Sequence, residues 1–199
     1  DKGRAKVAAS LLLTSPGTPY IYYGEEIGMS QAGVFDDMYR RSLMQWDVSA
    51  NAGFNTTGKR WLDEASWFPW KEKFEPWWKV DWEKSKKKSY VTVAQQSGDN
   101  TSLLSFYKKL ILLRNKELVL RSPESIKLYE ATGNAWVAKY TRGKNSLWII
   151  LNLDTDKVTN FKAPNVLHGA YLNLINDELL TIGDELVVEA GELMILSSE

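Results

Sequence analysis

Cysteine is absent from the 199 residues, and His168 is the only histidine. A disulfide framework and a thiolate metal site are therefore excluded, although the lack of cysteine does not identify the cellular compartment. Neither sign of charge is in excess, because Lys+Arg and Asp+Glu number 25 each. No segment has the length and apolarity of a membrane span, and the first residues lack the pattern of a signal peptide. We expect no nucleic-acid partner and no membrane partner, and the localisation stays unassigned.

Aromatic side chains are plentiful, with nine Trp and nine Tyr. Flat rings are the groups that proteins stack against sugar faces or bases, and a neutral partner fits the balanced charge. The length allows one large domain or two small ones, of which we prefer two.

The N-terminal stretch has the pattern of part of an α/β repeat. Residues 4–14 are almost all Ala, Val and Leu, which predicts a mostly buried helix that ends at Ser15-Pro16-Gly17. Residues 18–23 are too apolar to face water on either side, which predicts a buried parallel strand. The acidic pair Glu25-Glu26 follows at its C-terminal end, where α/β folds place their active sites. The alternative is a complete α+β domain whose first helix packs on a sheet.

Residues 30–98 show little regular periodicity but carry much of the aromatic content. A loop of this length inside a compact domain is usually functional or disordered, and its tryptophans argue against disorder. The rings either form a platform lining a sugar cleft or attach the loop to the rest of the fold; they are Trp61, Trp67, Phe68, Trp70, Trp77, Trp78 and Trp82. Asp99-Asn100-Thr101 then predicts the N-cap of a helix that runs to about Asn115.

After Pro123 the sequence changes to short β-rich runs separated by turn residues. Seven strands in fewer than 80 residues predict an antiparallel sandwich. The expected domains are residues 1–122 and residues 123–199. The predicted strands are 126–131, 135–142, 146–153, 158–163, 171–175, 185–189 and 192–197.

Four ordered motifs carry a family resemblance. Residues 17–29 (GTPYIYYGEEIGM), 41–47 (RSLMQWD), 51–59 (NAGFNTTGK) and 102–114 (SLLSFYKKLILLR) resemble, in that order, segments of the α-amylase family of glycoside hydrolases (family 13). The implied fold class is α/β plus all-β, namely the C-terminal part of a (β/α)8 TIM barrel followed by an antiparallel β-sandwich.

The resemblance implies a retaining mechanism, in which a nucleophilic carboxylate and an acid/base carboxylate lie about 5–5.5 Å apart. In this family these groups come from the fourth, fifth and seventh barrel strands, which are not in this sequence, and His168 in the sandwich cannot replace the histidine of the seventh. The expected catalytic set in this chain is therefore empty. We expect a fragment of an α-amylase or oligo-1,6-glucosidase-like enzyme that acts on starch or malto-oligosaccharides. Its partners are the α-glucan and the remaining N-terminal part of the enzyme.

The same resemblance assigns substrate binding to Arg41, Trp46 and Tyr23. Arg41 matches the arginine that holds the sugar at the cleavage site, and a buried salt bridge is the alternative for it. Glu25 and Glu26 are adjacent on an extended segment and point to opposite sides, so they cannot flank one bond, and Glu26 matches a bracing position.

No metal or cofactor is expected in this chain. Asp36 and Asp37 are an isolated acidic pair, which is a poor calcium signal, and calcium in the parent enzyme is left open. The competing interpretation is a non-catalytic carbohydrate-binding or scaffold fragment. The preference between α-1,4 and α-1,6 bonds, and between hydrolysis and transglycosylation, depends on loops outside this sequence.

Overall fold

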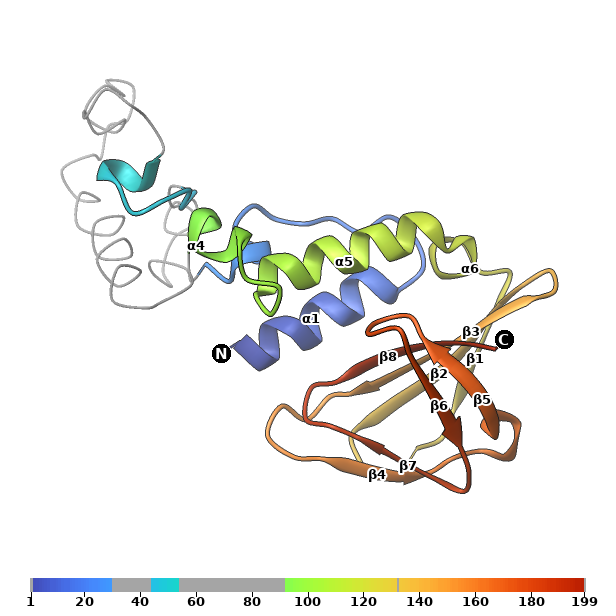
Figure 1. Cartoon of the computed structure of the whole chain (residues 1–199). Coiled ribbons are helices and arrows are strands. Elements are labelled where there is room, and N and C mark those ends of the chain that lie inside the picture. Colours follow the sequence, from blue (N-terminus) through green and yellow to red (C-terminus); the bar gives the residue numbers. More distant parts are fainter. Residues whose placement is uncertain (1, 30–43, 54–91, 132, 199) are drawn as a thin grey trace, which may run out of the picture. The chain divides into compact units, whose positions relative to one another are not determined.

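The computed structural model describes residues 2–29, 44–53, 92–131 and 133–198 (Figure 1). The helical elements in these ranges are α1 (Lys2–Thr14), η1 (Glu25–Ile27), η3 (Ala50–Gly53), α4 (Val93–Ser97), α5 (Leu103–Lys116), α6 (Leu118–Arg121) and η4 (Asn165–Leu167). The strands are β1 (Ser125–Tyr129), β2 (Ala135–Arg142), β3 (Asn145–Asn152), β4 (Thr159–Lys162), β5 (Gly169–Asn173), β6 (Glu178–Ile182), β7 (Glu185–Val188) and β8 (Leu193–Ser198).

The fold divides into two compact units. The first contains residues 1–20 and 107–199, and the second contains residues 21–106. The first unit therefore combines α1, most of α5 and all the strands. The expected domain boundary between residues 122 and 123 lies between α6 and β1 and stays a prediction.

Helix α1 is confirmed where the run of Ala, Val and Leu predicted it. The end of α1 and the loop after it receive hydrogen bonds from another helix, because the guanidinium of Arg114 on α5 donates to the carbonyls of Leu13 at 2.8 Å, Ser15 at 2.9 Å and Gly17. Gly17 adopts a φ of 97°, a left-handed conformation that favours glycine. Arg114 is only 4% exposed, so α5 and the end of α1 are joined by a buried cation.

The predicted buried strand at residues 18–23 is not formed. These residues carry no strand pairing, and the side chain of Tyr20 is 85% exposed. A strand is stabilised by the ladders of its neighbours, and the described part of the chain offers this segment no neighbouring strand. The expectation was wrong because burial on both faces needs neighbouring strands, which the described part of the chain does not place beside this segment.

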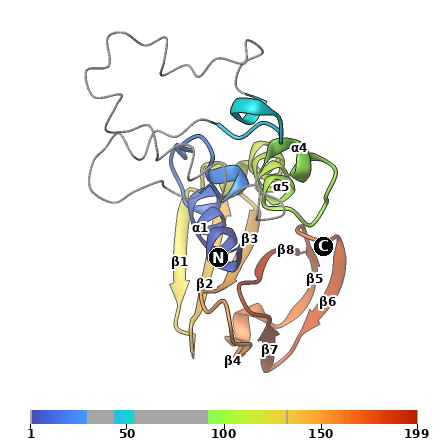
Figure 2. The same cartoon turned by 90° about the vertical axis from the view of Figure 1, so that its left-hand side faces the viewer.

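The strands form the predicted antiparallel sandwich. The larger sheet has six strands in the order β1-β2-β3-β8-β5-β6, and β4 pairs with β7 in a second sheet (Figure 2). All six strand pairings are antiparallel. Strand β6 was not predicted; it follows β5 through a turn in which Asp177 has a φ of 62°.

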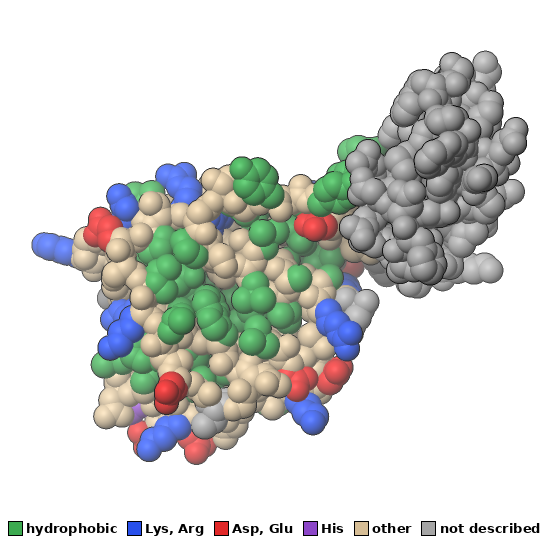
Figure 3. Space-filling model, turned by 180° about the vertical axis from the view of Figure 1, so that it is seen from behind, with side chains coloured by type: hydrophobic (Ala, Val, Ile, Leu, Met, Phe, Trp, Pro, Cys, Tyr) green, Lys and Arg blue, Asp and Glu red, His purple; other side chains and the backbone are tan. Residues whose placement is uncertain are grey.

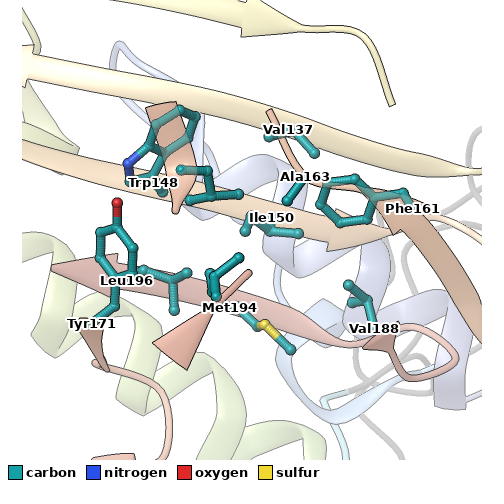
Figure 4. Close-up of a cluster of buried hydrophobic side chains, with 11 residues drawn as sticks. Val137, Trp148, Ile150, Phe161, Ala163, Tyr171, Val188, Met194 and Leu196 are labelled. Atoms are coloured by element: carbon teal, nitrogen blue, oxygen red, sulfur yellow. The ribbon is translucent and has the colours of Figure 1, made fainter. Parts of the chain in front are cut away.

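The core between the two sheets is built from side chains that alternate along each strand. Trp148 and Ile150 of β3, Phe161 of β4 and Val188 of β7 are at most 2% exposed (Figure 4). These rings and branched side chains fill the space between the sheets, and removing one such group typically costs several kcal/mol of stability.

The opposite face of the six-stranded sheet is also buried. Ala138 and Tyr140 of β2, Ile149 of β3 and Ile195 of β8 are at most 1% exposed. They lie on the face where α1 contacts β3 and α6 contacts β2 and β3. The central strands β2 and β3 are therefore covered on both sides.

Helix α5 begins later than predicted. Ser102, rather than the 99–101 segment, acts as its N-cap, because the Ser102 hydroxyl accepts the N–H of Ser105 at 3.1 Å. Asp99 instead accepts the N–H of Thr101 at 2.8 Å and closes the preceding turn.

Candidate functional site

The acidic turn after the extended segment is held by its own carboxylates. Glu26 accepts the N–H of Gly24 at 2.8 Å, and Glu25 accepts the N–H of Tyr22 at 3.3 Å. Gly24 has a φ of 89°, and a Cβ there would lie 2.6 Å from the sulfur of Met29. Both carboxylates face the backbone of the turn, so this geometry suits bracing and not a pair flanking a glycosidic bond.

Two tyrosines precede this turn with their rings in contact. The ring centroids of Tyr22 and Tyr23 are 4.8 Å apart at 39°, and the side chains are 50% and 42% exposed. An exposed, paired aromatic surface can pack on the apolar C–H face of a neutral sugar. The predicted binding residue Tyr23 is therefore accessible.

The Met-Gln-Trp-Asp segment, residues 44–47, is fixed from two sides by backbone hydrogen bonds. The N–H groups of Trp46 and Asp47 both donate to the carbonyl of Ala52, at 2.9 and 3.2 Å. On the other side, the first N–H groups of α4 donate to this segment: Val93 to the carbonyl of Gln45 at 2.9 Å and Ala94 to that of Trp46 at 2.8 Å. The indole of Trp46 is 49% exposed, although hydrogen bonds on both sides hold the backbone that carries it.

Asp47 is a turn residue and not a candidate acid or base. Its carboxylate accepts hydrogen bonds from the hydroxyl and the backbone N–H of Ser49, and these hold the pKa of Asp47 below its usual range. Gly53, with a φ of 70°, lies so close that a Cβ would come within 2.6 Å of the carboxylate. This contact explains why glycine occupies position 53.

Helix α4 connects the Trp46 segment with the acidic turn. Gln96 is 2% exposed; its amide donates to the carbonyl of Ile27 at 2.8 Å and accepts the N–H of Leu104 at 3.1 Å. The N-terminus of α4 is closed by a capping box, in which Thr92 and Gln95 satisfy each other's backbone N–H groups. One short helix thus holds the segments that carry Tyr23 and Trp46.

Several predicted residues lie outside the described ranges. They are Arg41, the pair Asp36 and Asp37, and the aromatic residues from Trp61 to Trp82. Among the residues that the structure does describe, no three His, Cys, Asp or Glu side chains gather into a metal site. In the same ranges, no helix is long and apolar enough to cross a bilayer.

Sequence reasoning missed the two buried glutamines of this site. Gln45 is 3% exposed, and its side-chain oxygen accepts no hydrogen bond. Gln96 bridges two elements, yet a glutamine in a polar stretch carries no sequence signal of its own. The spacing Thr92-x-x-Gln95 is the one available signal, because it predicts a capping box and hence a helix at this point.

The profile of the alpha amylase catalytic domain matches residues 1–122, the part of the chain that carries the acidic turn, the Met-Gln-Trp-Asp segment and α5. The chain belongs to the alpha-amylase family of glycoside hydrolases. The implied fold class is thereby confirmed: the chain has the C-terminal part of the family's barrel followed by the antiparallel sandwich.

Known relatives include members of different kinds. The amino acid transporter heavy chain SLC3A1 of Mus musculus is 38% identical over 118 residues, which are 55% of this chain and 14% of the relative. The alpha-amylase SusG of Bacteroides thetaiotaomicron is 37% identical over 112 residues, which are 56% of this chain and 13% of the relative. The chain therefore spans about one seventh of the length of these curated relatives.

The fold is shared with a solved enzyme over almost the whole chain. The trehalulose synthase MutB from Pseudomonas mesoacidophila MX-45 matches with a TM-score of 0.71 and 22% identity, covering 98% of this chain and 38% of that protein. At this level of identity the likeness concerns the fold alone.

Proposed function

We propose that this chain is the C-terminal portion of a retaining α-glucan hydrolase of the α-amylase or oligo-1,6-glucosidase type. In this proposal it contributes substrate-binding surface, while the catalytic carboxylates come from a part of the enzyme outside this chain. The substrates are starch or malto-oligosaccharides. The observation that carries the proposal is the pair of exposed ring residues, Tyr23 and Trp46, on two segments that α4 holds in one compact unit.

The chemistry of the unit favours a neutral polyhydroxy ligand. Each exposed ring offers a flat face for a sugar ring, and the chain has no excess charge to select an ionic substrate. Glu25 and Glu26 are bonded to their own turn, so they stabilise the platform and leave general acid/base work to other carboxylates.

Arg41 completes the proposed binding set. A guanidinium presents several donors in a fixed fork, which suits sugar hydroxyls or a partner carboxylate at the cleavage site. In the full-length enzyme, Arg41→Ala should lower kcat/KM by about one to two orders of magnitude while shifting Tm little, and Arg41→Lys should rescue little. An active but destabilised Arg41→Ala variant would make this arginine a structural ion-pair partner instead.

The rings are tested by substitution in the full-length enzyme with maltohexaose as substrate. Trp46→Ala and Tyr23→Ala should each raise KM about 5- to 30-fold, the equivalent of about 1–2 kcal/mol of lost ring contact. Trp46→Phe is the matched control, because it keeps a flat ring and should retain most of the affinity. Unchanged KM in both alanine variants would contradict the proposal.

A second candidate function rests on the similarity to SLC3A1, which is a transporter heavy chain by name. The same fold would then serve as a non-catalytic binding or scaffold portion. The two candidates differ in one measurement on the full-length protein: the release of reducing sugar from soluble starch. No release together with retained maltohexaose binding would favour the second candidate.

A further inference from the structure

Two lysines lie directly opposite each other on neighbouring strands of the six-stranded sheet. Lys127 of β1 is the cross-strand partner of Lys139 of β2. Side chains paired in this way point to the same face, with their Cβ atoms about 4.5–5.5 Å apart, and like charges in this arrangement are unfavourable. An anion bound between the two ammonium groups would remove this repulsion.

No carboxylate of the described residues compensates the lysine pair. Neither lysine forms an ion pair within these residues, and Glu124, the acid that precedes β1, is bonded to other groups. Its carboxylate accepts the N–H of Gly143 at 2.9 Å and lies 3.9 Å from the guanidinium of Arg142. The two positive charges are therefore available to an anion from solution.

Two aromatic rings hold the ammonium groups in one small region. The Nζ of Lys127 lies 4.9 Å from the ring centroid of Tyr129, and that of Lys139 lies 5.3 Å from the ring centroid of Trp148. The two rings are in contact, with centroids 4.9 Å apart. Trp148 is 2% exposed and belongs to the core between the sheets, so its ring is a fixed support. A lysine that lies over a ring has less conformational freedom to lose when an anion binds.

A pair of hydroxyl groups lies beside the lysines on the same face. Ser125 and Thr141 are the cross-strand pair two residues along the strands from Lys127 and Lys139, or about 6.8 Å away. Their hydroxyl oxygens are hydrogen-bonded to each other. This bond uses one of the two hydroxyl hydrogens, so the other can be donated to an oxyanion. Lysine and hydroxyl donors are groups that proteins use to bind phosphate.

We propose that Lys127 and Lys139, with the hydroxyl pair of Ser125 and Thr141 beside them, bind a phosphate group, either as the free ion or as a sugar monophosphate. A phosphate dianion matches the charge of two ammonium groups, and its oxygens can accept hydrogen bonds from several donors at once. A single carboxylate would neutralise only one of the two lysines.

A small ligand fits this position better than a polyanion does. The sequence has no excess of positive charge, and two lysines offer only a small cationic area. On the face shown in Figure 3, the Lys and Arg side chains of the described residues are scattered among Asp and Glu and do not gather into one basic field. Nucleic acids and anionic membranes are bound by extended basic surfaces.

Calorimetric titration of the 199-residue chain with sodium phosphate tests the site. The titration is made at pH 8, where phosphate is a dianion, and sodium chloride of equal ionic strength is the salt control. Lys127→Met and Lys139→Met keep the apolar stems on the rings but remove the charges, so each should weaken phosphate binding about 10-fold. Lys162→Met is the matched control, because Lys162 is an exposed lysine on β4 of the second sheet and its replacement should leave phosphate binding unchanged.

Titration with glucose 6-phosphate distinguishes the two sources of the phosphate group. Equal affinities for phosphate and glucose 6-phosphate would identify the free ion as the ligand. Tighter binding of glucose 6-phosphate that is lost when both lysines are replaced by methionine would identify the ester.

Two results would overturn the proposal. One is phosphate that neither gives binding heat nor raises Tm above the chloride control. The other is undiminished phosphate binding in the variant that carries both Lys127→Met and Lys139→Met. These titrations use no α-glucan and measure no hydrolysis, so their outcome is independent of the proposed enzymatic function.

Discussion

Removing the guanidinium of Arg114 should destabilise the chain more than any other single charge removal in the described residues. Arg114→Met keeps the length and apolar stem of the side chain but leaves the carbonyls of Leu13, Ser15 and Gly17 without their donor. The end of α1 and the start of the following loop would then lose their connection to α5.

The magnitude follows from two opposing contributions. Hydrogen bonds to a charged group contribute about 1.5–3 kcal/mol each, and three are lost. Burial of the cation costs free energy in the native protein, and the same burial lowers the pKa of Arg114. We expect a net loss of about 2–4 kcal/mol in the free energy of unfolding, or about 5–15 °C in Tm.

Urea unfolding of residues 1–199 followed by circular dichroism measures this loss. Arg121→Met is the control, because Arg121 is exposed on α6 and its replacement should change stability by less than about 0.5 kcal/mol. Arg114→Lys should fall between the two, since an ammonium cannot reach all three carbonyls. An Arg114→Met variant as stable as the Arg121→Met control would refute the reasoning.

Three further predictions concern the same chain. Asn152→Asp should prevent stable folding, or lower Tm by at least 10 °C, because the buried amide donates to the carbonyls of Lys157, Val188 and Glu189 and a carboxylate would face three oxygens. Asn152→Asp with native stability would contradict this. Burial raises the pKa of Glu192, so its contribution to stability is present at low pH and is lost as the pH rises through that pKa. Glu192→Gln should therefore stabilise the chain at pH 7 by less than about 1 kcal/mol and have no effect at pH 3. Equal effects at both pH values would contradict a raised pKa of Glu192. Residues 1–199 alone should release no reducing sugar from soluble starch, because the catalytic carboxylates are expected outside this chain; release that Glu25→Gln abolishes would refute the assignment of Glu25 as a structural residue.

The sandwich could be predicted from the sequence because each of its strands is indicated by residues that are close together in the chain. Each strand alternates between two faces, and turn residues separate the strands, so the pattern alone places most of them. Strand β6 was missed because its Glu-Leu-Leu-Thr-Ile run is short and its turn signal, Asn176-Asp177, was not recognised. The prediction of a strand at residues 18–23 failed because a strand there depends on neighbouring strands, and the described residues supply none beside it.

The sequence indicated which residues could bind the substrate, but it did not indicate the hydrogen bonds that connect the segments carrying them. Tyr23 and Trp46 were named from the family resemblance, and the structure leaves both rings exposed, which is compatible with the predicted role. Gln96 was missed because its structural role depends on hydrogen bonds to Ile27 and Leu104. These residues lie 69 and 8 positions away in the sequence, so no local pattern indicates them. Arg114 was not singled out from the sequence, because its three acceptors, the carbonyls of Leu13, Ser15 and Gly17, lie about 100 residues earlier in the chain.

The bond between Arg114 and the carbonyl of Leu13 joins residues 101 positions apart. During synthesis at about 5–20 residues per second, α1 therefore waits roughly 5–20 seconds for its partner to be made. Throughout that interval α5 and the sheet are incomplete, so α1 cannot yet make the contacts that it has with them in the structure. The hairpins of the sandwich close within a few residues, so they form quickly once they are synthesised. Packing of α1 on α5 and on the sheet therefore has to wait until both of these later segments have been synthesised.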